Sequence, residues 1–200
     1  NILEGYGFSE MRWHSAEQIH LFAEAARRAY ADRNHYLADP DFVEMPLKRM
    51  TSSSYASERA ATISTSMATP STSVGPGMEG DPGESEETTH FSIVDAAGNA
   101  VSVTTTINSW YGSKVTVTGA GFVLNNEMDD FAAKPGTPNQ FGLVQGENNA
   151  IGPGKRMLSA MSPSIVLGQD DELLMVTGTP GGSTIITTVF QTISNVVDYG

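Results

Sequence analysis

The sequence contains no cysteine, which excludes a disulfide framework and a zinc site built on thiolates. No apolar run approaches the roughly 18 residues that a membrane span requires. No basic segment followed by an apolar stretch opens the given sequence. The four histidines are scattered without the spacing of metal ligands, and we predict neither a metal nor a cofactor.

Basic side chains are scarce, because 11 Lys and Arg face 23 Asp and Glu and leave a formal net charge of −12. This charge repels nucleic acid and anionic bilayers, which argues against both as partners. Hydrophobic residues make up 39% of the chain, with 20 glycines and 10 prolines, a composition typical of a turn-rich sheet protein. Its 200 residues suffice for one or two domains with a buried core.

Two helices are predicted in the first third of the chain, which starts at Asn1 without an initiator Met and is expected to be an internal piece of a longer protein. Ser15 and Gln18 have the spacing of a capping box. An apolar stripe follows and predicts a helix to about Arg33 that packs on the core through Ile19, Phe22, Ala23, Ala26 and Tyr30. A short helix is expected over residues 55–62, behind a cap at Ser54.

Residues 64–87 are rich in Ser, Thr, Pro, Gly and Glu and have almost no large apolar side chain. Such a composition does not repay the entropy lost on ordering, so this segment is predicted to be an exposed, mobile linker. Residues 75–80 match the G-x-G-x-x-G pattern, but no strand precedes them and no helix follows. The dinucleotide-binding interpretation therefore fails.

Strand patterns begin at Thr88. Residues 90–94 and 100–107 flank a Gly-Asn turn and predict a hairpin. Further strands are expected at residues 121–124, 164–167 and 173–177. A final amphipathic helix is predicted from Ser183, with Ile186, Val189, Phe190, Ile193 and Val197 on its apolar face.

Thr88 stands where the acidic linker ends and the first strand begins. If the bond between Glu87 and Thr88 is cut, Thr88 gains a free α-amino group beside its own hydroxyl. An α-amine has a pKa of about 7.7 to 8.0, so it can accept the hydroxyl proton near neutrality. Nucleophile and base then lie in one residue. The alternative from the pattern alone is that Thr88 and Thr89 are only the polar start of a strand.

Four blocks carry a family resemblance, namely residues 88–95 (TTHFSIVD), 124–131 (LNNEMDDF), 155–163 (KRMLSAMSP) and 177–183 (TGTPGGS). In order and spacing they closely resemble the γ-glutamyltransferase family of N-terminal nucleophile hydrolases. The resemblance implies the α+β class and part of an αββα sandwich. Residues 1–87 would form the C-terminal part of a large subunit, and residues 88–200 the N-terminal part of the small catalytic subunit. Family members are made as one precursor that cuts itself before the catalytic Thr, here between Glu87 and Thr88.

The resemblance also assigns the catalytic roles. Thr88 corresponds to the nucleophile, and Thr106 to the Thr that hydrogen-bonds it. Gly181 and Gly182 correspond to the backbone N–H pair that holds the oxyanion. Their place before a helix supports this role, because N–H groups at a helix N-terminus are unpaired and carry positive partial charge. A plain turn is the commoner use of two adjacent glycines.

The substrate-binding positions follow from the same resemblance. Asn108, Glu127 and Asp130 correspond to residues that bind the substrate α-amino group, for which carboxylates are natural partners. A solvated loop is the alternative for the two acids. Ser159 and Ala160 replace a block that usually reads Ser-Ser, so one of the two hydroxyls expected at the α-carboxylate is missing.

Two further departures concern a loop and an arginine. The lid-like loop over residues 135–142 carries Phe141 where many bacterial members have Tyr, so a hydroxyl that could latch the loop is absent. The family Arg that faces the α-carboxylate would lie before Asn1.

Three functions remain open at this stage. The first is γ-glutamyl transfer or hydrolysis, with glutathione or a related amide as donor and water, an amino acid or a peptide as acceptor. The second is a glutaryl-type cephalosporin acylase on the same scaffold, for which the change to Ala160 leaves room. The third is a catalytically incomplete fragment or binding module. The resemblance further implies a heterodimer of large and small subunits and a periplasmic or extracellular location.

Overall fold

The structure of the chain, a computed structural model, describes residues 1–75 and 88–200. The described helices are α1 (Ala16–Tyr36), α2 (Leu47–Met50), α3 (Ser53–Ala60) and α4 (Ile185–Tyr199). The described strands are β1 (Thr88–Val94), β2 (Ala100–Thr106), β3 (Thr116–Val117), β4 (Phe122–Val123), β5 (Ser164–Leu167) and β6 (Leu173–Thr177). The mixed α+β class is confirmed. Glu87 and most of the 75–80 glycine pattern lie outside the described residues.

Helix α1 begins at the predicted cap. The Ser15 side-chain oxygen accepts a hydrogen bond from the Gln18 N–H at 3.2 Å. The Gln18 side chain reaches back and accepts from the His14 N–H at 2.7 Å. The helix continues to Tyr36, beyond the predicted end at Arg33.

The buried face of α1 differs from the predicted one. Ile19 is 55% exposed, and Phe22 lines an open groove between α1 and α4. The least exposed residues of α1 are Leu21 and Glu24, each at 1%, and Arg28 and Asn34, each at 2%. The core stripe predicted from apolar spacing is therefore wrong for Ile19 and Ala23, which are exposed, whereas Phe22 packs partly buried against the hydrophobic cluster. The buried face of α1 includes charged side chains that neutralise one another.

Residues 64–75, expected to belong to the mobile linker, are held against α1. The Thr69 hydroxyl donates to Glu24 Oε2 at 2.6 Å, and the Thr69 N–H donates to Glu24 Oε1 at 3.0 Å. Val74 is buried. Composition misses this arrangement because a few polar contacts, rather than apolar bulk, fix the segment.

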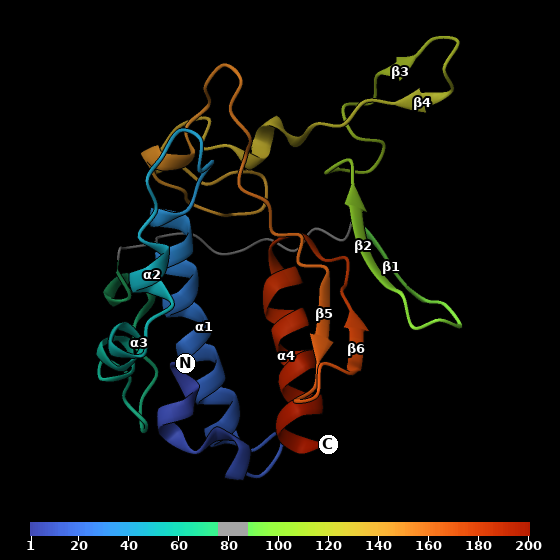
Figure 1. Cartoon of the computed structure of the whole chain (residues 1–200). Helices are drawn as coiled ribbons and strands as arrows, with labels where there is room; N and C mark the ends of the chain where they lie inside the picture. Colours follow the sequence, from blue (N-terminus) through green and yellow to red (C-terminus); the bar gives the residue numbers. More distant parts are fainter. Residues whose placement is uncertain (76–87) are drawn as a thin grey trace.

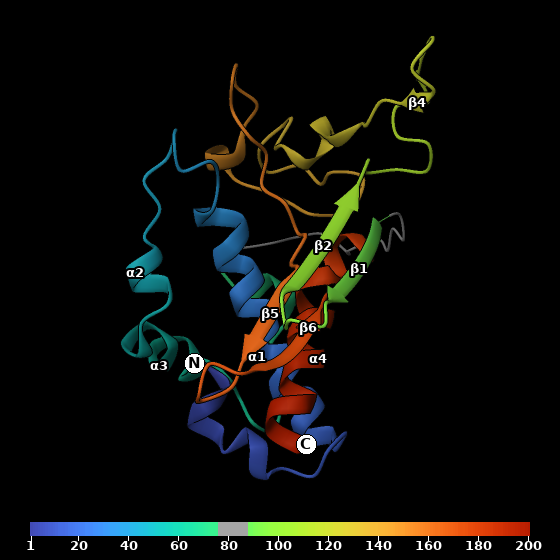
Figure 2. The same ribbon diagram turned by 45° about the vertical axis from the view of Figure 1, so that its right-hand side comes forward.

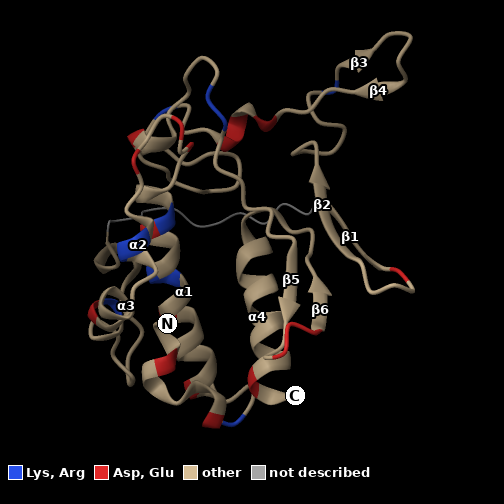
Figure 3. Cartoon of the chain, in the orientation of Figure 1, with Lys and Arg blue, Asp and Glu red and all other residues tan. Residues whose placement is uncertain are grey.

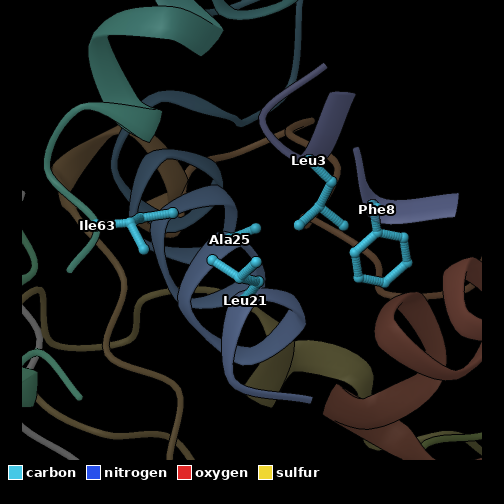
Figure 4. Close-up of a cluster of buried hydrophobic side chains, with 5 residues drawn as sticks. All are labelled: Leu3, Phe8, Leu21, Ala25 and Ile63. Carbon is cyan, nitrogen blue, oxygen red and sulfur yellow. The ribbon is translucent and has the colours of Figure 1, made fainter. Parts of the chain in front are cut away.

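Helix α3 matches its prediction with a shift of register. Its cap is Ser52 rather than Ser54, because the Ser52 side chain accepts from the Tyr55 N–H at 3.2 Å. The hydrophobic cluster nearby gathers side chains from the N-terminal 3₁₀ turns, from α1 and from the segment after α3, and consists of Leu3, Phe8, Leu21, Ala25 and Ile63 (Figure 4).

The predicted hairpin and the predicted strands at residues 164–167 and 173–177 are confirmed. Strands β1 and β2 pair antiparallel with Thr88 opposite Thr106, and β5 pairs antiparallel with β6. The two hairpins are adjacent, since the Ser102 hydroxyl of β2 donates to the Thr177 carbonyl of β6 at 2.9 Å. Figures 1 and 2 show α4 beside the β5–β6 hairpin, whereas the small β3–β4 hairpin projects away.

Helix α4 follows the Gly-Gly turn as predicted, after one 3₁₀ turn, η6 (Gly182–Thr184). Of its predicted apolar face Val189 is buried, whereas Phe190 and Val197 are exposed. Among the described residues no helix has both the length and the apolar character needed to cross a membrane.

Candidate active site

One pocket lies where β1 begins, β2 ends and α4 begins. It gathers seven of the predicted site residues from distant parts of the chain. They are Thr88, Thr106, Asn108, Asp130, Ser159, Ala160 and Gly182. Its lining also includes residues that the sequence did not single out, namely Arg33, Leu143, Gln145, Leu158, Met161, Ser183 and Ile185, together with Phe141 of the expected lid.

The two threonines face each other across the β1–β2 ladder. Thr88 and Thr106 are direct register partners, and both side chains line the pocket. Opposite residues in an antiparallel pair have Cα atoms about 4.5 to 5.5 Å apart, close enough for side-chain contact. Thr106 Oγ1 also accepts a hydrogen bond from the Asn108 N–H at 2.9 Å. The ladder thus brings a second hydroxyl to the residue predicted to be the nucleophile.

Asn108 connects the end of β2 to the acidic segment. Its backbone has φ of 76°, a left-handed conformation that asparagine tolerates better than most residues. Its side-chain amide donates to the Asn126 carbonyl at 3.1 Å, and Asn126 Oδ1 accepts from the Ser109 N–H at 2.9 Å. These bonds fix the chain immediately before the acidic 3₁₀ turn.

The acidic turn is η4 (Glu127–Asp130). Two amides clamp its end, because Gln145 Nε2 and Asn149 Nδ2 donate to the Asp130 carbonyl at 3.1 and 2.7 Å. Burial raises the pKa of the Asp130 carboxyl to about 6, with further increases from Glu127 and Asp129 and an opposing effect of Arg33. Burial also raises the pKa of Glu127, although Glu127 is not among the lining residues. The site therefore holds a carboxylate that favours a cationic ligand.

Arg33 is the charged residue that sequence reasoning missed. It extends from the last turns of α1 into the pocket wall, where its Nη2 donates to the Ser159 carbonyl at 3.0 Å and its Nη1 donates to Asn34 Oδ1 at 2.8 Å. The Ser159 hydroxyl accepts from the Met161 N–H at 3.1 Å. Only the tertiary contact with a loop 126 positions away reveals this role, so local spacing carries no signal for it.

The glycine turn completes the pocket. Gly182 lines it, whereas Gly181 precedes it with φ of 134° and is not among the lining residues. An added Cβ at Gly181 would lie 2.8 Å from the Thr184 hydroxyl, so this position requires glycine both for its conformation and for space. The Thr184 hydroxyl in turn donates to the Gly181 carbonyl at 2.8 Å.

Comparison with known proteins identifies the family of this chain. The family model described as gamma-glutamyltranspeptidase matches residues 1–200. The chain is 54% identical over 200 residues to the glutathione hydrolase proenzyme of Pseudomonas sp. (strain A14) and 50% identical over 200 residues to that of Escherichia coli (strain K12). Both matches cover 100% of this chain and 34% of the relative. The chain is also 38% identical over 199 residues to the acylase ACY 1 proenzyme of Pseudomonas sp. (strain SE83), covering 100% of this chain and 33% of the relative.

Solved structures agree with this relationship. A gamma-glutamyltranspeptidase from Pseudomonas nitroreducens, complexed with L-DON, is 61% identical with a TM-score of 0.54, over 56% of this chain and 57% of that chain. The cephalosporin acylase from Bacillus halodurans is 24% identical with a TM-score of 0.79, over 100% of this chain and 32% of that chain, and shows the shared fold. The fold is thus that of the N-terminal nucleophile hydrolases. The chain spans about a third of the length of its curated relatives and belongs to the gamma-glutamyltranspeptidase family.

Proposed function

We propose that this chain is the central part of a self-processing γ-glutamyl transferase or hydrolase whose nucleophile is Thr88. The observation that carries the proposal is the pocket itself, in which Thr88 and Thr106 face each other beside Gly182 and Asp130. Family membership, and the proenzyme names of the relatives, support a precursor that cuts itself before Thr88.

The chemistry begins with the cut between Glu87 and Thr88, which releases the Thr88 α-amine. This amine takes the proton of the Thr88 hydroxyl while the hydroxyl oxygen attacks the γ-carbonyl carbon of the donor. The oxyanion that forms is stabilised by backbone N–H groups of the turn that contains Gly182.

Collapse of this intermediate breaks the bond between the carbonyl carbon and the amide nitrogen of the donor. The leaving amine takes the proton held by the Thr88 amine and departs. The γ-glutamyl group is now an ester on Thr88 Oγ1. Water or the amine of an amino acid or peptide then attacks the ester through the same sequence of proton transfers, and the hydroxyl is restored.

The donor is recognised by the Asp130 carboxylate, which has no ion pair in the described residues. Asp130, together with Glu127 and Asn108, binds the α-ammonium group of glutathione or another γ-glutamyl donor. The Ser159 hydroxyl donates a hydrogen bond to the α-carboxylate of the donor, and Ala160 has no hydroxyl to add a second one. Residues 1–87 and 88–200 then belong to the large and small subunits of a heterodimer, which we place in the periplasm or outside the cell.

A glutaryl-type acylase is the second candidate. Ala160 favours it, because a site with fewer hydroxyls at the α-carboxylate is less committed to an amino-acid head group. The likeness to the acylase ACY 1 proenzyme and to the cephalosporin acylase fold is consistent with it, at lower identity than the glutathione hydrolases.

The test of the main proposal uses the full-length precursor that contains this chain. Intact-mass measurement should find a new N-terminus at Thr88. A separate activity assay should detect release of p-nitroaniline from γ-glutamyl-p-nitroanilide. Thr88→Ala should lose both the cleavage and the activity completely. Thr89→Ala, one residue along the same strand, is the matched control and should keep both. A precursor that stays uncut yet fully active would refute the assignment of Thr88.

A further inference from the structure

Tyr30 joins α1 to the turn that opens α4. Its hydroxyl donates to the Ser183 carbonyl, 153 positions away in the sequence. Burial raises the pKa of Tyr30, against an opposing effect of Arg33, so the hydroxyl keeps its proton and acts as a donor at neutral pH. Tyr30 itself lines the groove between the two helices and is not among the residues that line the pocket of Thr88.

The turn to which Tyr30 is hydrogen-bonded contains two polar groups that donate no hydrogen bond within residues 1–75 and 88–200. The Ser183 hydroxyl is buried, with the residue only 6% exposed, and makes no hydrogen bond. The Gly182 N–H likewise donates to no described residue. Both residues line the pocket that contains Thr88. Buried polar groups are normally paired, so the unpaired Ser183 hydroxyl beside a predicted nucleophile indicates a group kept for a ligand, with the Gly182 N–H next to it.

The backbone of this turn contains two adjacent glycines. Gly181 and Gly182 both have positive φ, at 134° and 52°, and glycine populates many conformations at little cost. Within the turn, the Thr184 hydroxyl and N–H both donate to the Gly181 carbonyl, at 2.8 and 2.9 Å, whereas the Ser183 carbonyl is bonded from outside. Among the described residues, the Tyr30 hydroxyl is the side chain from outside the turn that hydrogen-bonds the Ser183 carbonyl.

We propose that Tyr30 is a positioning residue, whose hydroxyl fixes the Gly181–Ser183 turn so that the Gly182 N–H and the Ser183 hydroxyl point at the acyl oxygen of the donor bound to Thr88. The proposal rests on the function proposed above. It assigns Ser183 a hydrogen bond to the developing oxyanion and gives α1 a role in the chemistry without contact with substrate.

The test compares Tyr30→Phe with Tyr6→Phe in the full-length precursor. The Tyr6 hydroxyl donates to the Ala60 carbonyl at 2.7 Å, so the control loses the same type of bond far from the pocket. The kcat and KM for γ-glutamyl-p-nitroanilide are measured per cleaved enzyme, with the cleaved fraction taken from intact mass. Loss of one oxyanion donor costs about 10² to 10³ in kcat, so a displaced donor should cost about tenfold.

We expect Tyr30→Phe to lower kcat about tenfold with KM changed less than twofold, and Tyr6→Phe to change neither. Ser183→Ala should lower kcat as well, and the double variant Tyr30→Phe/Ser183→Ala should lose less than the product of the two single effects, because both act through one turn. The melting temperature is expected to fall equally in Tyr30→Phe and Tyr6→Phe. A fall in kcat in Tyr30→Phe alone then reflects loss of positioning and not loss of general stability.

Failure of Tyr30→Phe alone to cleave, with Tyr6→Phe cleaving normally, would support the role at the maturation step, where the same Thr88 reacts. A kcat for Tyr30→Phe within twofold of Tyr6→Phe, in an active wild type, would overturn the positioning role and leave the function intact. A wild type that cleaves but does not hydrolyse the γ-glutamyl donor would instead refute the proposed function.

Discussion

Two regions of the molecule hold buried carboxylates in opposite ways. On the buried face of α1, Glu24 pairs with Arg28 at 2.6 Å and accepts a hydrogen bond from the Thr69 hydroxyl at 2.6 Å. Burial by itself raises the pKa of Glu24, but the bonds from Thr69 and Arg28 outweigh it and lower the pKa to about 2. At the pocket Asp130 has no ion pair with any residue in the described ranges, and burial with the nearby Glu127 raises its pKa to about 6.

The difference follows from what each carboxylate contacts. Figure 3 shows basic residues on α1, α2 and α3 and on the loops near η4, whereas η4 itself carries acidic residues and no basic ones. A buried charge is costly unless it is paired. The carboxylate of Glu24 has its partner within the chain, whereas the carboxylate of Asp130 has no ion pair in the described residues, as expected if it binds the ligand that we propose.

The largest expected effect comes from removing the pocket charge. A γ-glutamyl donor carries an ammonium for Asp130, whereas a glutaryl donor leaves the carboxylate unpaired, so wild type should favour γ-glutamyl-p-nitroanilide over glutaryl-p-nitroanilide by up to about 10⁴ in kcat/KM. Asp130→Asn should remove most of this preference without loss of thermal stability. A wild type that prefers the glutaryl donor, or an equal loss for both donors in Asp130→Asn, would favour the acylase.

The converse change is expected at Glu24. Glu24→Gln keeps the shape of the side chain but leaves Arg28 buried without a counter-charge, which should lower the free energy of unfolding by about 3 kcal/mol. The exposed Glu17 on the same helix supplies the control, since Glu17→Gln should change it by less than about 0.5 kcal/mol. Urea denaturation measures both. If Glu24→Gln matched the control, the contrast between the two regions would disappear.

The smallest expected effect is a different pH dependence in the two regions, of ligand binding at Asp130 and of stability at Glu24. Asp130 binds an ammonium only as a carboxylate, so L-glutamate binding to the mature enzyme should weaken as pH falls through about 6, by about tenfold per pH unit once protonation dominates. Glu24, with its lowered pKa, contributes stability that is present above its unfolded pKa of about 4.3 and is lost toward pH 2. Calorimetric Kd values between pH 5 and 7 test the first, and Asp130→Asn should abolish the trend.

Local pattern was sufficient for much of the fold. The hairpin predicted from residues 90–94 and 100–107, the strands at 164–167 and 173–177, and the helix from Ser183 could be predicted because turn residues and side-chain alternation act within a few positions. The family resemblance then named seven residues that the structure brings to one pocket. Their catalytic roles remain predictions.

The sequence could not reveal contacts that depend on distant chain segments. The pairing of Glu24 with Arg28 and Thr69 makes a charged face the buried one, so apolar spacing indicated the wrong side of α1. Arg33 reaches the pocket, and Tyr30 reaches the Ser183 turn beside it, only because α1 packs next to segments more than 120 positions away. No pattern over one helix contains that information.

The ion pair between Asp39 and Arg156 has a consequence for the protein after its proposed cut. Arg156 Nη2 lies 2.6 Å from Asp39 Oδ1 and joins the segment after α1 to the loop that carries Ser159. While the chain is continuous, the covalent tether keeps such partners at high effective concentration. Once the bond before Thr88 is cut, contacts of this kind must hold the two pieces together. Arg156 remains 64% exposed in its side chain, so added salt should weaken this attachment before it weakens the buried one at Tyr30.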